Sequence, residues 1–263
     1  MKIIFFGASK LGFKCCEAII NAGHEVVGIF TIPREFNISY SPDKPVINYL
    51  FEDFYKIGEG FNIPVFEVNQ NIKSYYDIIK DLNPDFILAI GWYYIIPKSI
   101  LLLANKGAAG IHASLLPKGR GNAPLVWALI EGQSETGVSF FFFSEGVDNG
   151  DLIAQKVIPI DQEETIKTLL DKVENASIEI LLENLPKIKN CSIIPISQDH
   201  SKATYYPKRS PEDGLINWND PPEKIMRFIR AQTKPYPGAF TVIGDKKVII
   251  WDATVKYNGN ENL

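Results

Sequence analysis

Residues 2–31, KIIFFGASKLGFKCCEAIINAGHEVVGIFT, contain the pattern that decides the fold. The apolar runs KIIFF (2–6) and EVVGIFT (25–31) are typical of buried strands. The segment between them repeats its apolar residues at helical spacing as far as Gly23. A strand, a helix and a second strand in this order indicate a βαβ unit, which joins two parallel strands through a helix.

The same alternation continues beyond this first unit. Further strands are predicted at 63–68, 85–90 and 108–114, and helical segments near 71–82 and 97–105. Repeated units of this kind predict an α/β fold with a doubly wound, Rossmann-like parallel sheet. Ligands bind such sheets beyond the carboxyl ends of the strands. Because Gly7, Trp92 and His112 follow strand ends, we expect them to converge there.

The remaining segments predict a large domain followed by a small one. Residues 32–47 form a long stretch without a period, and we predict a loop there. The helical period over 163–190 is expected to close the main domain, and the segment around Gly244 and Asp245 is typical of a hairpin. We therefore predict a catalytic domain over 1–200 and a small mixed α/β appendage over 205–263.

Composition excludes several classes of function. The 263 residues are 46% hydrophobic and 22% charged, with a net charge of −4, so nothing in the overall balance attracts nucleic acid. The three cysteines, of which Cys15 and Cys16 are adjacent, fit neither a disulfide framework nor a spaced zinc site, and we expect no metal. No stretch approaches the roughly 18 apolar residues of a membrane-spanning helix. These features predict a cytoplasmic enzyme without a membrane partner.

The loop GASKLG (7–12) follows the first predicted strand and opens a helix. It has two glycines, and the second predicted strand ends without the acidic residue that holds a ribose, so NAD binding is disfavoured. The backbone amides at such a helix start, with Gly7, Ser9 and Lys10, are candidates for a phosphate contact. Tight-turn geometry without any ligand is the alternative.

The strongest chemical signal is the stretch GIHASLLPKGRGNAP (110–124) with the later turn VDNGD (147–151). His112 is one of three histidines and lies at the end of a predicted strand, while Asp148 comes from a separate loop. A histidine and a carboxylate delivered by two loops, with Arg120 between them, indicate a preorganised proton-transfer site. Common turn chemistry is the alternative for Asp148, and core packing the alternative for His112.

This constellation resembles the signature of the folate-dependent formyltransferases. In that family Asn-x-His precedes SLLP, an Arg-Gly follows, and a GxDxGD turn supplies the catalytic aspartate; here the Asn position is Gly110. The resemblance implies His112 and Asp148 as catalytic residues and 10-formyltetrahydrofolate as co-substrate. It also implies a folate pocket built from GWYYIIP (91–97), SLLP and the catalytic turn. The pocket residues that it implies are Trp92, Tyr93, Ser114, Leu115, Leu116, Pro117 and Val147.

The tail gives a second resemblance. ATYYPKRSPEDGLINW (203–218) and IRAQTKPYPGAF (229–240) are similar to the C-terminal part of sugar-nucleotide N-formyltransferases. This implies a UDP- or dTDP-linked amino deoxysugar as acceptor, with a role in polysaccharide biosynthesis. Arginine forks and tyrosine rings suit a diphosphate and a base. The implied substrate-binding residues are Arg120, Tyr206, Lys208, Arg209 and Arg230, together with Gly7, Ser9 and Lys10; solvated turns and structural arginines are the alternative.

Two other functions remain open at this point. Methionyl-tRNA formyltransferases share the catalytic signature, but residues 202–263 hold 10 basic and 7 acidic residues, a weak +3 for tRNA binding. The second alternative is a pseudoenzyme that binds folate or a nucleotide, because Gly110 removes an amide donor whose loss costs about 10²–10³ in rate. Asn122, a water or a reshaped pocket could compensate. The sequence leaves the oligomeric state open, with a homodimer as one alternative.

Overall fold

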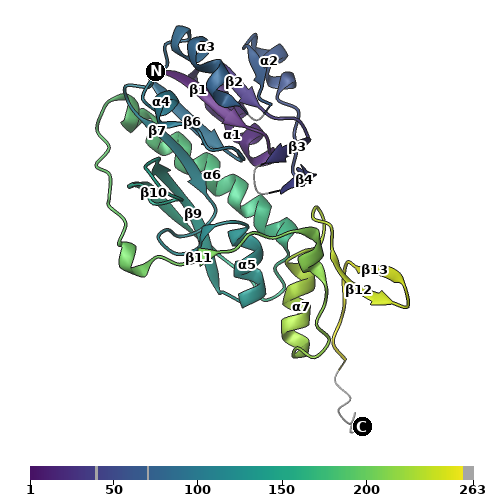
Figure 1. Ribbon diagram of the computed structural model, residues 1–263. Helices are drawn as coiled ribbons and strands as arrows, with labels where there is room; N and C mark the ends of the chain where they lie inside the picture. Colours follow the sequence, from purple (N-terminus) through teal and green to yellow (C-terminus); the bar gives the residue numbers. More distant parts are fainter. Residues whose placement is uncertain (39–40, 70, 257–263) are drawn as a thin grey trace.

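The structure is a computed structural model that describes residues 1–38, 41–69 and 71–256 (Figure 1). Its centre is a seven-stranded sheet in the order β10-β9-β7-β6-β1-β2-β5. Five strands run parallel, with β1 in their middle, so the predicted α/β architecture is confirmed. The strands of this sheet are β1 (Lys2–Gly7), β2 (Glu25–Thr31), β5 (Val65–Glu67), β6 (Phe86–Ile90), β7 (Ala108–His112), β9 (Glu135–Phe142) and β10 (Leu152–Pro159).

The sheet is mixed, whereas the sequence predicted parallel strands throughout. β9 runs antiparallel to both β7 and β10, and Gly110 pairs with Phe141 and His112 with Ser139. The short turn over 143–151 explains the antiparallel β9–β10 pair, because a parallel pair needs a crossover of about a dozen residues or more. The antiparallel edge matters for the site, since this turn carries Asp148 back to the end of β7.

Both faces of the sheet are covered, as the two sets of side chains on β1 show. Ile3 and Phe5 pack with the helices α1 (Lys10–Asn21) and α6 (Ile166–Lys189), while Ile4 and Phe6 belong to the core of the opposite face. All four side chains are fully buried. This is why the β1 sequence is continuously apolar rather than alternating. The opposite face is covered by α3 (Tyr76–Asp81), which follows a 3₁₀ turn (Ile72–Tyr75), and by α4 (Lys98–Leu101).

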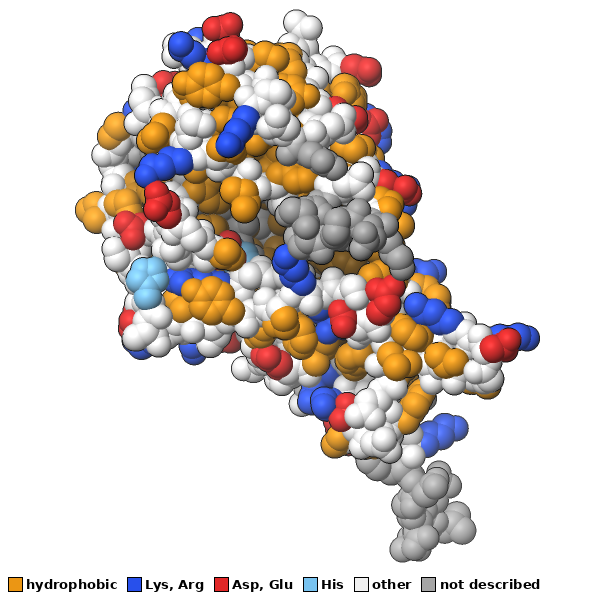
Figure 2. Space-filling view, viewed as in Figure 1, with side chains coloured by type: hydrophobic (Ala, Val, Ile, Leu, Met, Phe, Trp, Pro, Cys, Tyr) orange, Lys and Arg blue, Asp and Glu red, His pale blue; other side chains and the backbone are white. Residues whose placement is uncertain are grey.

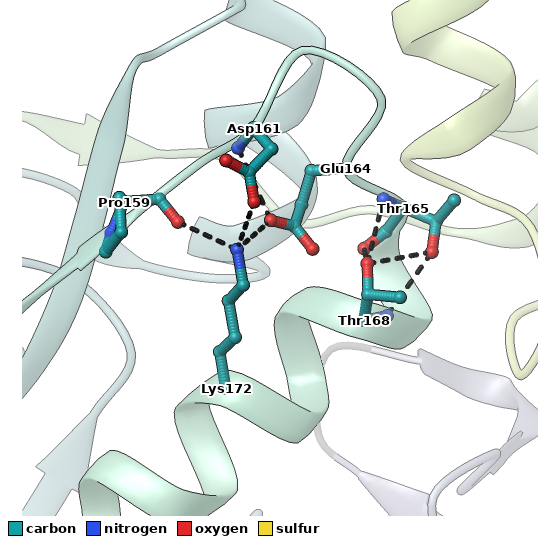
Figure 3. Close-up of polar contacts among 6 residues, drawn as sticks. All are labelled: Pro159, Asp161, Glu164, Thr165, Thr168 and Lys172. Carbon is teal, nitrogen blue, oxygen red and sulfur yellow. Dashed lines mark hydrogen bonds and ion pairs between the residues drawn. The ribbon is translucent and has the colours of Figure 1, made fainter.

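The start of α6 is fixed to the end of β10 by a compact polar cluster (Figure 3). Thr165 caps the helix and exchanges hydrogen bonds with Thr168. One turn further on, the Lys172 ammonium donates to Pro159 O at 3.2 Å, to Asp161 Oδ2 at 2.8 Å and to the buried carboxylate of Glu164. Lys172 therefore joins the last residue of β10 to the helix that closes the domain.

Two segments before the middle of the chain differ from the prediction. The expected loop over 32–47 contains a hairpin of β3 (Glu35–Ile38) and β4 (Ser41–Ile47), with residues 39–40 outside the described part. Three prolines within this stretch hid its strand character. A short helix α2 (Tyr55–Phe61) follows, which the sequence did not predict.

After α6 the chain runs as an extended strap, residues 196–206, from β10 to the segment after β7 (Figure 1). Its strand β11 (Tyr205–Tyr206) pairs with the two-residue strand β8 (Arg120–Gly121), just before α5 (Pro124–Glu131). Helix α7 (Pro222–Arg230) and the hairpin of β12 (Ala239–Ile243) and β13 (Lys246–Ile250) then follow. This hairpin turns at Gly244 as predicted, since Ile243 pairs with Lys246. Within the described residues, no helix has the length and apolar character needed to cross a membrane.

Candidate active site

His112 is the last residue of β7 and faces two acceptor oxygens. Its Nε2 lies 2.8 Å from the carbonyl oxygen of Gly119, and its Nδ1 lies 3.6 Å from Oδ2 of Asp148. A carbonyl and a carboxylate can only accept protons. Nε2 therefore donates to Gly119 O, and the Asp148 carboxylate faces Nδ1 on the other side of the ring.

Asp148 approaches this ring from the turn after β9. Its backbone adopts a left-handed conformation, with φ of 51°, which is uncommon outside glycine but tolerated by Asp. Its Oδ2 accepts a hydrogen bond of 2.9 Å from the amide of Gly121. The side chains of His112 and Asp148 are 11% and 20% exposed, so the pair is shielded yet accessible to a small reactant. The structure thus brings the two predicted catalytic residues together.

The loop after β7 is held from beneath by two polar side chains. The Ser139 hydroxyl donates to Ser114 O at 2.6 Å and accepts from the amide of Leu116 at 3.0 Å. Gln155 donates to Leu116 O at 2.8 Å. Leu116 is buried against Phe141 and Leu152. The predicted pocket residues Ser114, Leu115, Leu116 and Pro117 therefore form a fixed wall beside His112.

The segment after β6, the strand next to β7, forms a second wall of the site, and this wall is aromatic. Trp92 packs edge-on against Phe6, with ring centroids 5.2 Å apart, and its indole nitrogen is buried with no hydrogen-bond partner among the described residues. The hydroxyl of Tyr93 donates to Asn48 at 3.0 Å. On the face in Figure 2 the surface is hollowed near its centre, with hydrophobic side chains around the hollow. Val147, beside Asp148, is 60% exposed.

The loop after β1 is covered by the chain rather than open to a phosphate. Gly7 and Ser9 are buried, and a β-carbon at Gly7 would stand 2.8 Å from the Phe54 ring. The amide of Lys10 donates to Leu50 O at 2.7 Å. Its ammonium lies 3.3–3.5 Å from two carboxylates of α6, Glu174 and Asp171. These contacts give no support to a phosphate site at the start of α1, and they favour the tight-turn interpretation.

Arg120 is buried behind the catalytic pair, with 2% of its surface exposed. Its guanidinium donates to the Tyr205 hydroxyl at 2.9 Å, to Gln198 Oε1 at 2.7 Å and to Nδ1 of His200 at 2.9 Å. Since arginine only donates, His200 accepts through an unprotonated Nδ1. These contacts indicate a structural role for Arg120, because its guanidinium is already bound to the protein and is not free to bind a phosphate.

Tyr206 and Arg209 gather on Trp127 of α5. The Tyr206 and Trp127 rings are stacked with centroids 5.8 Å apart, and the Arg209 guanidinium lies 4.9 Å from the centre of the Trp127 ring. Burial, followed by a hydrogen bond to Glu131, raises the pKa of Tyr206 to about 12. Burial also lowers the pKa of Arg209. Asn122 Oδ1 faces the amide of Arg209 at 3.4 Å, which connects this cluster to the loop after Gly121.

Arg230 lies apart from the cluster of Tyr206, Arg209 and Trp127, although the sequence analysis grouped Arg230 with Tyr206 and Arg209 as substrate-binding residues. Its guanidinium binds Glu163 Oε2 at 3.1 Å and Gln162 O at 2.7 Å. These groups lie beside a hollow of about 820 Å³ that is lined by α5, α7 and the segment 160–164 before α6. Lys208 is exposed near Arg209.

Within the described part of the chain no three His, Cys, Asp or Glu side chains gather as metal ligands.

Two residues that contact the site were missed by the sequence. Gln198 donates to Asp148 O at 2.9 Å and to Gly150 O at 2.6 Å, and Phe143 lies against Gly110. Gln198 belongs to a turn-rich segment with no periodic signal, and its partners are about 50 residues away in sequence. No local pattern could have identified it.

Several solved structures share the fold of this chain. The chain is similar to HypX from Aquifex aeolicus (19% identity, TM-score 0.71), and covers 99% of its own length but 41% of that chain. It is similar to an N-formyltransferase from Helicobacter canadensis in complex with folinic acid and dTDP-3-aminofucose (17% identity, TM-score 0.72, covering 95% and 86%). It also resembles methionyl-tRNA formyltransferase from Clostridium thermocellum (22% identity, TM-score 0.62, covering 98% and 95%).

At these identities the likeness concerns the fold alone, whereas family membership is shown by the sequence models. Residues 1–185 match the formyl transferase model, and residues 208–262 match the formyl transferase C-terminal domain. The first of these spans the whole central sheet and most of α6, including β7, the His112 loop and the Asp148 turn. The chain therefore belongs to the formyl transferase family.

Proposed function

We propose that this chain transfers the formyl group of 10-formyltetrahydrofolate to the amino group of a nucleotide-linked amino deoxysugar. The observation that carries the proposal is the contact of His112 with Asp148 at the carboxyl end of β7, within the region matched by the formyl transferase model. The co-substrate follows from the family. The sugar nucleotide follows from the resemblance of residues 203–218 and 229–240 to sugar-nucleotide N-formyltransferases and from the ligands of the Helicobacter canadensis neighbour.

The walls beside His112 suit a folate. Trp92 and the Ser114–Pro117 loop offer apolar surface at adjacent strand ends, and the buried indole nitrogen of Trp92 is a donor without a partner among the described residues. The exposed side chain of Val147 lies on the catalytic turn and completes this group.

The reaction needs a bond from the acceptor amine to the formyl carbon and loss of the bond from that carbon to the folate nitrogen. The amine loses one proton and the folate nitrogen gains one. The Nε2–H group of His112 can stabilise the developing oxyanion, and the pair with Asp148 can carry the proton between the two nitrogens. Because Nε2 of His112 binds Gly119 O, a reactant that uses this proton must replace the carbonyl. No Ser or Cys nucleophile is needed for direct attack.

The nucleotide is proposed to lie along the surface that continues from Gly121 to Trp127. Asn122, Tyr206 and Arg209 line this path, and they combine stacked rings with a guanidinium. Tyrosine and arginine of this kind suit a base and a diphosphate. Arg120, Lys10 and Arg230 are bound to other groups of the chain and are left out of the proposed substrate contacts. Arg209 is kept because its bonds to Asp213 O and Gln232 Oε1 both come from one nitrogen, Nη2.

The experiment is a formyl-consumption assay with UDP- and dTDP-linked amino sugars, beginning with dTDP-3-aminofucose, and with methionyl-tRNA as the competing acceptor. Turnover with a sugar nucleotide supports the proposal. Turnover with methionyl-tRNA alone would assign the chain to the tRNA branch. Folate binding without transfer to any acceptor would favour the pseudoenzyme. Trapping of a formyl-enzyme by rapid quench would exclude direct attack.

A further inference from the structure

The catalytic pair is held by a segment that lies far from it in sequence. Residues 196–206 run between the Asp148 turn and the 119–121 segment. On one side Ile196 exchanges two backbone hydrogen bonds with Leu152, and on the other Tyr205 pairs with Arg120. Thr204 adds bonds to the amides of Gly119 and Arg120. One strap therefore joins the two loops that contact His112 and Asp148.

Within the described residues, Gln198 is the only side chain of this strap that hydrogen-bonds to both loops. It is 5% exposed, and its amide is fully used. Its Nε2 donates to the carbonyl oxygens of Asp148 and Gly150, while its Oε1 accepts from the buried Arg120. The amide thus fixes the backbone on both sides of Asn149, where Asp148 has its left-handed φ.

A turn of this kind depends on such support. A non-glycine residue in the left-handed region, as Asp148 is, costs about 1 kcal/mol. If the turn relaxed, the Asp148 carboxylate would move away from Gly121 N and from the His112 ring. A displacement of about 1 Å in a reacting group can reduce the rate by about 10²-fold.

We infer that Gln198 is a positioning residue: held by Arg120, it fixes the Asp148 turn so that the carboxylate meets His112. This rests on the proposed function only in taking His112 and Asp148 as the reacting pair. Gln198 does not touch the reactants, and it acts through Asp148. Arg120 in turn orients Gln198, which gives this buried cation a role without substrate contact.

Two substitutions separate positioning from general support. Gln198→Met keeps the length of the side chain but loses all three bonds. Gln198→Glu retains an acceptor for Arg120, so the cation stays paired, while both donors to the turn are lost. Ser197→Ala is the matched control, because Ser197 lies on the same strap, is exposed, and bonds to Asp151 rather than to Asp148. All three are compared in the full chain, with melting temperature as the check on folding.

With 10-formyltetrahydrofolate and dTDP-3-aminofucose, or the panel sugar that gives turnover, both Gln198 variants should lose kcat by about 10- to 100-fold. KM for each substrate should change by less than about threefold, since no binding contact is removed. Amide exchange at Gly121, which donates to Asp148, should accelerate in both variants and stay unchanged in Ser197→Ala. In an Asp148→Asn background, a Gln198 substitution should add little further loss.

Unchanged kcat in both folded variants, or a loss that multiplies fully with that of Asp148→Asn, would overturn the positioning role and leave the proposed function intact. Full turnover in Asp148→Asn alone would instead overturn the role proposed for Asp148, and with it the purpose of the Gln198 contact. The Gly121 exchange measurement distinguishes these results, because it reports on the turn without any activity.

Discussion

The ring of Phe143 lies where a side chain at position 110 would have to stand. A β-carbon built on Gly110 would be 2.7 Å from Cζ of Phe143 and 2.7 Å from the carbonyl oxygen of Ala89 on the neighbouring strand. Real β-carbons essentially never approach other heavy atoms this closely. A side chain at position 110 therefore requires Phe143 or the neighbouring strand to shift, which favours a reshaped pocket over a simple loss of the family's asparagine.

This relationship predicts the effect of Gly110→Asn. We expect turnover to fall rather than rise, together with a loss of stability of about 1–3 kcal/mol, typical of overpacking. Gly110→Asn with Phe143→Ala should recover part of the stability, since the ring is removed, but the clash with Ala89 O remains. Single-turnover kinetics and thermal melting measure both effects. An increase in turnover of Gly110→Asn towards 10²-fold would show that a missing donor, not a reshaped pocket, limits the enzyme.

The sequence was informative where side chains follow a local period. β1 was recognisable because both of its faces are buried, and the hairpin at Gly244 because a turn residue lies between two apolar runs. The pair of His112 and Asp148 was found through the motif that carries them. The division of the chain near residues 200–205 stays a prediction.

What the sequence could not give depends on distant partners. The short connection over 143–151 is a local signal for the antiparallel β9–β10 pair, but nothing near residues 135–142 places β9 beside β7. The charges of Lys10, Arg120 and Arg230 suggested substrate contacts, yet each one meets acceptors from segments at least 67 residues away. Long-range pairing of this kind is set by tertiary packing, and the residue type alone does not reveal it.

The polar cluster at the start of α6 predicts a stability effect without an activity effect. Lys172→Met should leave the buried Glu164 carboxylate without its cation, at a cost of about 2 kcal/mol. The melting temperature should fall by about 4–8 °C. Lys167→Met, on the exposed face of the same helix, is the matched control. Equal melting temperatures for the two variants would mean that the cluster contributes nothing to the fold.

Alkaline pH should destabilise the fold through Tyr236. Burial raises the pKa of Tyr236 to about 12, from an ordinary value of 10.0. Between these values the unfolded chain loses the phenolic proton while the folded chain retains it, so stability falls as pH rises from about 10 towards 12. Tyr236→Phe should show a shallower decline in melting temperature than the wild type, whereas Tyr76→Phe, at an exposed position, should not. Parallel declines in all three proteins would assign the alkaline loss to other groups.

The contact of His112 with Asp148 predicts that their contributions to catalysis are not independent. His112→Asn should reduce kcat by about 10²–10⁴, the usual contribution of a positioned acid or base, with folate binding largely retained. Asp148→Asn keeps an amide oxygen that can accept from Gly121, so the turn should survive while the charge opposite Nδ1 is lost.

Because both residues act on one proton, the double variant should be little worse than the poorer single variant. Steady-state kcat, kcat/KM and folate affinity are measured for the wild type, the two single variants and the double variant, which together form a double-mutant cycle. Near-normal turnover in His112→Asn would make the ring structural. A double variant that shows the full product of the two single losses would mean that His112 and Asp148 work separately, and that the 3.6 Å contact between them is not the centre of the reaction.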